Sequence, residues 1–117
     1  MDAERLHEIF QPYGPVSVRR LFGGFGIYDA DLIIAVFLRG ELMFKGDDET
    51  APLFAAVGSA QWSYTREGRA KATFMPFWPL PESAYDDEDE LVKWAKLALG
   101  AAQRRERAKK VVKKKRK

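Results

Sequence analysis

The most concentrated chemistry in the sequence is a run of cations at its C-terminal end. Residues 103–117, called here the cationic segment, hold ten of the twenty basic residues and one acid, so their net charge is +9. Such a segment neutralises the phosphates of a nucleic-acid backbone without reading its bases. The alternative is a solubilising segment with no dedicated partner. The predicted nucleic-acid-binding residues are Arg104, Arg105, Arg107, Lys109, Lys110, Lys113, Lys114, Lys115, Arg116 and Lys117.

The remainder of the chain, residues 1–102, carries the opposite charge. This body holds ten basic and sixteen acidic residues, a net charge of −6. A polyanion would repel the body as a whole and attract the cationic segment. We therefore expect a folded domain over residues 1–102. Because its charges repel one another, the cationic segment is expected to be disordered or a frayed extension of the last helix.

A glycine-rich stretch, Leu-Phe-Gly-Gly-Phe-Gly at residues 21–26, could be taken for a phosphate-binding loop. Such loops need a helix N-terminus directly after the glycines, so that free amides meet the anion. Here Ile27, Tyr28 and a predicted turn follow instead. The interpretation that we favour is structural: the glycines relieve a tight bend or admit a neighbouring backbone.

Residue types that support catalysis or metal binding are scarce. The chain has no cysteine and one histidine, His7, which excludes disulfides, thiolate metal sites and a cysteine nucleophile. The acidic run at residues 86–90 suits the positive end of a helix dipole and lacks the ligand spacing of a calcium loop. No catalytic residue, metal site or cofactor is predicted, and an enzyme is the least favoured function.

A second set of cations lies among aromatic residues on predicted strands. A basic, aromatic sheet face could bind single-stranded nucleic acid. The alternative is that these residues are ordinary solvent-facing charges on a half-buried sheet. We favour this alternative. The residues are Arg19, Arg20, Lys45, Tyr64, Arg66, Arg69 and Lys71.

The elements that position these groups can be read from the spacing of apolar residues. The chain length suits one domain, and no apolar run approaches the roughly 20 residues of a membrane span. Together with an N-terminus unlike a signal peptide, this predicts a cytoplasmic protein without a membrane partner. The expected fold is α+β, an antiparallel sheet of five to six strands with helices packed against it. Helices are predicted at 2–11, 47–58 and from about 87, strands at 16–22, 25–28, 32–38 and 41–45, and a hairpin at 62–66 and 71–78.

Residues 19–28, Arg-Arg-Leu-Phe-Gly-Gly-Phe-Gly-Ile-Tyr, resemble the signature of the TfoX N-terminal domain family. Residues 40–45, 54–59 and 91–95 support the resemblance, which covers about residues 5–102. It implies an α+β fold and a non-enzymatic, transcription-related role, similar to that of a bacterial regulator of natural competence genes that acts with the cyclic-AMP receptor protein. The full-length regulator has a second, helical domain, and here a basic tail stands in its place.

The resemblance and the charge division together favour a small regulatory or adaptor domain. The expected partners are DNA through the cationic segment, a transcription factor or other protein, and a second copy of the chain. The alternative is a protein-interaction module without nucleic acid, which would use an exposed sheet edge. Candidate partner-binding residues, for which a structural role is favoured over docking, are Arg19, Arg20, Gly23, Gly24, Tyr28, Tyr64, Arg66 and Arg69.

Overall fold

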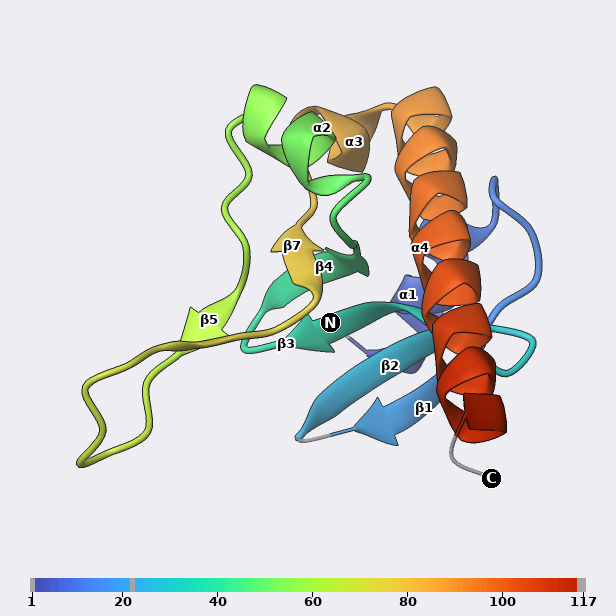
Figure 1. The fold of residues 1–117 in the computed structure, drawn as a ribbon. Coiled ribbons are helices and arrows are strands. Elements are labelled where there is room, and N and C mark those ends of the chain that lie inside the picture. Colours follow the sequence, from blue (N-terminus) through green and yellow to red (C-terminus); the bar gives the residue numbers. More distant parts are fainter. Residues whose placement is uncertain (1, 22, 116–117) are drawn as a thin grey trace.

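A computed structural model describes residues 2–21 and 23–115, and its architecture is α+β, as predicted (Figure 1). One antiparallel sheet is flanked by helices, and α4 crosses it as a long rod. The elements in chain order are α1 (Ala3–Phe10), β1 (Ser17–Leu21), β2 (Gly24–Asp29), β3 (Leu32–Leu38), β4 (Glu41–Lys45), α2 (Ala51–Ala56), β5 (Ser63–Tyr64), β6 (Thr73–Phe74), β7 (Phe77–Pro79), α3 (Ser83–Asp86) and α4 (Glu88–Lys115).

The first four strands form a meander because each is followed by a tight turn. The strand order is β1-β2-β3-β4-β7, and every neighbouring pair is antiparallel. Gly23 between β1 and β2 has φ 79°, and Gly40 between β3 and β4 has φ 78°. Glycine adopts this left-handed backbone without the steric cost that a side chain brings. The strands expected at 32–38 and 41–45 are confirmed, whereas Phe22 of the first expected strand lies outside the described residues.

The sheet face under the helices carries the main core. Alternate strand residues such as Ile27, Ala35 and Phe44 point to this face and are fully buried. Three aromatic rings then tie separate elements together. Phe54 of α2 stacks on Trp78 of β7 at a centroid distance of 5.2 Å and on Trp94 of α4 at 4.7 Å. This column fixes where α4 lies relative to the sheet edge.

The opposite sheet face carries a smaller apolar cluster. Val36, Met43 and Phe77 are buried there, and Trp62 and Met75 pack against the cluster from the segment between α2 and β7. Both faces of the central strands are therefore covered, which accounts for the continuous apolar run of β3.

The predicted hairpin at 62–66 and 71–78 is present, and the end of its second strand also joins the main sheet. β5 and β6 pair over two residues on each side in a separate small sheet. The pairing continues at Trp62, which accepts from the N–H of Met75 at 2.9 Å and donates to the carbonyl of Phe77 at 2.8 Å. Pro76 lacks an amide hydrogen for a ladder, and beyond it the chain turns back so that β7 joins the edge of the main sheet beside β4. Residues 63–74 project from the body as an arm (Figure 1).

The last helix is longer than the packed core requires. It begins after Asp87, whose side chain accepts a hydrogen bond from the backbone N–H of Asp89, and it continues for 28 residues to Lys115. Residues 103–115 continue this helix, while Arg116 and Lys117 lie outside the described residues. The domain boundary at residue 102 stays a prediction, because α4 runs across it. None of the described helices is both long and apolar enough to cross a membrane.

Candidate functional site

Residues 103–115 of the cationic segment form the C-terminal part of α4, beyond the last buried residues of the helix. Ala98, Ala101 and Ala102 are buried, and from Arg107 to Val111 every residue is exposed. Successive residues of an α-helix are turned by about 100°, so cations at 105, 107, 109 and 110 point to different sides. This part of α4 presents positive charge on several sides. Lys113, Lys114 and Lys115 belong to its last turn.

Arg104 is the member of this segment that the body holds. Its Nε lies 2.6 Å from Oδ2 of Asp47, and its Nη2 donates to Oδ1 of Asp47 at 3.1 Å. The same Nε lies 2.9 Å from a carboxylate oxygen of Glu49. The guanidinium therefore makes a two-pronged ion pair with a residue 57 positions away in the sequence. Of the ten cations predicted to bind nucleic acid, this one is already engaged by acids of the body.

Asp47 is oriented for this contact by the turn that leads into α2. Its backbone N–H donates to the hydroxyl of Thr50 at 3.0 Å, and its carboxylate accepts from the backbone N–H of Thr50 at 3.2 Å. Thr50 is itself buried. This reciprocal arrangement resembles a capping box, and it leaves the outer side of the Asp47 carboxylate facing α4.

The ion pair changes the acidity of both partners. The guanidinium of Arg104 and two backbone N–H groups keep the pKa of Asp47 below its usual value, although partial burial opposes them. The carboxylates of Asp47 and Glu49 raise the pKa of Arg104. Both side chains are about one-third exposed or less, at 32% and 27%, so the contact is partly screened by water.

The predicted partner-binding residues of β1 and β2 lie side by side at one edge of the sheet. The guanidinium of Arg19 lies 4.7 Å from the ring centre of Tyr28, and that of Arg20 lies 5.9 Å from the ring centre of Phe25. These cation–π contacts hold both arginines along the strands. The edge strand β1 pairs with β2 alone in the described sheet.

Gly24 and Gly26 of β2 lie where a side chain would not fit. A Cβ on Gly24 would lie 2.1 Å from the backbone oxygen of Phe37, closer than any real contact. A Cβ on Gly26 would lie 2.9 Å from the ring of Tyr28 and 3.1 Å from Leu21. Neighbouring strands and side chains occupy the space that a side chain would need. This close approach supports the structural interpretation of the glycine stretch.

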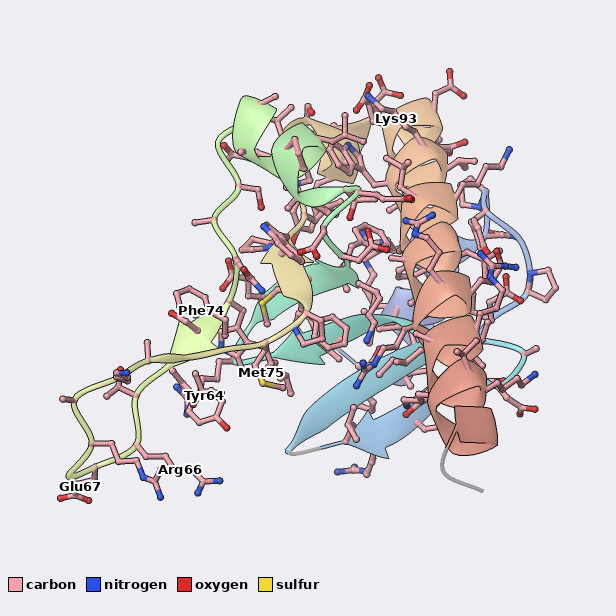
Figure 2. The ribbon with its side chains drawn as sticks, viewed as in Figure 1. Tyr64, Arg66, Glu67, Phe74, Met75 and Lys93 are labelled. Carbon is pink, nitrogen blue, oxygen red and sulfur yellow. The ribbon has the colours of Figure 1, made fainter. Side chains whose placement is uncertain are left out.

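Tyr64, Arg66 and Arg69 belong to the arm and not to the sheet edge. Figure 2 shows Arg66 and Glu67 at the outer end of the arm, with Tyr64 nearer to the body. A pocket of about 680 Å³ lies where the arm meets the sheet, and Gly23, Leu38 and Tyr64 are among its lining residues. The structure thus brings Gly23 and Tyr64 to one pocket but places Arg66 elsewhere.

The basic residues once grouped as one sheet face are dispersed. Lys45 lies on β4, two strands away from β2 and three from β1, and its Nζ lies 5.2 Å from the ring centre of Phe77. Neighbouring strands are about 4.8 Å apart, so Arg19 and Lys45 are separated by roughly 14 Å across the sheet. Arg66 and Arg69 are on the arm. The cations of the body therefore do not form one continuous strip.

Sequence reasoning missed the acids that receive Arg104. Asp47 and Glu49 lie at the start of the helix predicted at 47–58, where acids complement the positive end of the helix dipole. Nothing local links them to α4, because the contact depends on how α4 crosses the sheet. His7, the single histidine, is exposed on α1, and among residues 2–21 and 23–115 no three His, Asp or Glu side chains are grouped to hold a metal ion.

The comparison with family models gives a match to the TfoX N-terminal domain over residues 8–102. No curated protein matches the chain. The matched range runs from the end of α1 to the last buried turn of α4 and stops where the cationic segment begins. With most of its length covered in this way, the chain belongs to the TfoX N-terminal domain family, a family of regulatory domains.

Proposed function

We propose that this chain is a transcription-related regulatory domain that binds nucleic acid through the cationic segment, without base specificity. One observation carries the proposal. The buried stripe of α4 ends at Ala102, yet the helix continues to Lys115, and every residue from Arg107 to Val111 is exposed. Beyond Arg104, which the body holds, these cations are available to a partner of opposite charge.

The dimensions and charges suit a phosphate backbone. At 1.5 Å per residue, the thirteen residues from 103 to 115 extend about 20 Å. Duplex DNA carries one negative charge per about 1.7 Å of its axis, so several phosphates lie within reach of such a helix. The net charge of −6 on the body repels the duplex. The orientation of binding follows: the end of α4 meets the phosphates, and the body stays away from them.

The test is a matched pair of triple substitutions in the full chain. One variant is R107Q/K110Q/K113Q in the cationic segment, and its control is R66Q/R69Q/K71Q in the arm, which removes the same charge. We expect the first to weaken binding to duplex DNA and to reduce the slope of log affinity against log salt by roughly 2.7, about 0.9 for each lost contact. Gel-shift titration at three salt concentrations measures both.

Two results would contradict this function. Unchanged affinity and slope in the helix variant would remove the role of the cationic segment. A larger loss in the arm variant would transfer binding to the arm, where Tyr64 and Phe74 could stack on the bases of a single strand. Repeating the titration with single-stranded DNA distinguishes this second outcome from duplex binding.

The second candidate is a protein-interaction module, and the exposed aromatic surface of the arm favours it. Phe74 is 63% exposed and Tyr64 is 38% exposed, while the backbone of β5 and β6 pairs over only two residues on each side. Large apolar side chains in the open often mark contact surfaces. If the arm binds a second copy, light scattering will show concentration-dependent association that F74S abolishes. A monomer at all concentrations would eliminate self-association.

A further inference from the structure

A groove of about 450 Å³ lies between α4 and the segment that connects β4 to α2. One wall comes from Lys45, Gly46 and Asp47, and the opposite wall comes from Ala101, Arg105 and Ala108 of α4. Trp78 lies at its base. The volume falls within the range of about 300–1,000 Å³ that is typical of small-molecule sites. The body and the cationic segment both contribute to this groove.

The neighbours of Trp78 in the groove lining hold it firmly. Its ring stacks on Phe54 with an interplanar angle of 10°. A Cβ on Gly46 would come within 2.6 Å of two indole carbons, so the backbone of Gly46 also packs closely against the ring. Trp78 is 6% exposed and therefore offers little surface on which a ligand could stack. Specificity in the groove must come from its charged rim.

The rim of the groove carries positive charge that its own acids do not neutralise. Lys45 forms no ion pair with any residue in the described part of the chain, whereas Asp47 and Glu49 are occupied by Arg104. The pKa of Lys45 is lowered by burial first and then by the nearby charges of Arg105 and Lys109, and Asp47 opposes this only weakly. Asp48 is the remaining carboxylate of the lining and is exposed. Lys45 and Arg105, from two different elements, thus line one groove, and the charge of Lys109 adds to the positive potential at Lys45.

We propose that this groove binds a phosphate group, held by Lys45 from the sheet together with Arg105 from α4, which both line it. A phosphate offers several strong acceptor oxygens, which suit one ammonium group and one planar guanidinium. Its charge would relieve the repulsion between these two cations. The phosphate can belong to a free mononucleotide or to the backbone of a nucleic acid. The site goes beyond nonspecific binding by the cationic segment, because it requires a residue of the body.

The experiment uses the full chain and isothermal titration calorimetry with sodium pyrophosphate, adenosine monophosphate and a short DNA duplex as probes. The variants are K45Q and R105Q, and the control is K96Q, which removes one charge from an exposed position of α4 outside the groove. Each groove variant is expected to weaken binding of the phosphate probe by about tenfold or more, since a hydrogen bond to a charged group contributes about 1.5–3 kcal/mol. K96Q is expected to change it less than twofold.

The probes separate the two sources of phosphate. Binding of pyrophosphate or adenosine monophosphate that K45Q weakens assigns the groove to a free ligand. Weakening of the duplex alone assigns it to a backbone phosphate. The proposal is overturned if K45Q binds every probe as the unaltered chain does, or if K96Q loses as much as K45Q. Circular dichroism confirms that each variant is folded. The R107Q/K110Q/K113Q variant keeps Lys45 and Arg105, so failure of the cationic segment and failure of the groove remain distinguishable.

Discussion

The two halves of α4 are both helical, but the first half packs against the body and the second half extends beyond the packed core. From Glu88 to Ala102 the helix has acids in its first turn and an apolar stripe that includes Leu91, Trp94 and Ala98, all buried against the body. From Arg107 to Val111 every residue is exposed, and the cations point to different sides. The first half is stabilised by tertiary packing. The second half extends a helix that is already formed in the first half, so it does not need to nucleate a helix of its own.

The difference shows how one helix can combine a structural part with a binding part. Acids at the start and bases at the end both complement the helix dipole, so the charge division of the chain also favours the long helix. Repulsion between cations four residues apart, such as Arg105 and Lys109, opposes it. Arg104 lies at the junction and is the side chain through which the second half holds the body. Changes before, at and after this junction should therefore differ in size.

The largest effect is expected from Trp94→Ala in the packed half. Trp94 is 1% exposed and stacks on Phe54, so its removal leaves a cavity in the aromatic column. We expect a loss of about 3–5 kcal/mol in the free energy of unfolding. Lys110→Ala in the other half should change it by no more than about 0.5 kcal/mol. Urea unfolding followed by circular dichroism measures both, and similar losses in the two variants would refute the distinction between the halves.

An intermediate effect is expected from Arg104→Gln at the junction. Because both partners are partly exposed and screened, the loss should be about 0.5–1 kcal/mol at neutral pH. The pKa of Asp47 is lowered in the folded protein, so the ion pair stabilises it fully above about the ordinary carboxyl value of 3.8 and loses its effect as the pH falls through the lowered value. Unfolding measured at pH 7 and at pH 2.5 should show the difference from the unaltered chain shrinking.

Asp47→Asn supplies the control for this pair. It removes the charge but keeps an acceptor for the backbone N–H groups of the α2 turn. In a double-mutant cycle the two substitutions should be non-additive, because each removes the same contact. Full additivity would show that Arg104 does not anchor α4 through Asp47.

The smallest effect, and one of opposite sign, is expected from Lys45→Gln. Burial and the charges of Arg105 and Lys109 lower the pKa of Lys45, so the folded state disfavours the ammonium form. Its removal should raise the free energy of unfolding by a few tenths of a kcal/mol, up to about 0.5. This gain is present below the lowered pKa and disappears as the pH rises toward the ordinary value of 10.5. A loss of stability at pH 7 would contradict the uncompensated charge that the groove proposal assumes.

Features that depend on residues close together in the sequence were predicted correctly, whereas features that depend on contacts between distant residues were not. Strands β3 and β4 were predicted with their correct bounds, because a dense apolar run and a Gly40 turn are local signals. The predicted hairpin is present as far as Phe77, whose carbonyl accepts from the N–H of Trp62, but the pairing of Phe77 and Trp78 with β4 in the main sheet was not predicted. The apolar composition of a strand predicts that it is buried, but not which neighbour it joins.

The candidate sites divide in the same way. The cations of the segment were evident from composition, whereas the groove joins Lys45 to Arg105 across sixty positions of the sequence. Nothing near Lys45 in the sequence indicates that it shares a groove with Arg105 of α4. The anchoring of Arg104 by Asp47 is equally non-local, with 57 positions between them.

The amino-acid sequence alone determined the α+β class, the opposite charges of body and segment, and the position where the apolar stripe of the last helix ends. These follow from periodicity and composition, which are properties of short stretches of chain. Tertiary structure alone decided which acids meet Arg104, which strand completes the sheet and which cations share a groove. Those depend on the path of α4 over the sheet, and that path is set by the packing of Trp94, Phe54 and Trp78, residues from three elements that are distant in the sequence.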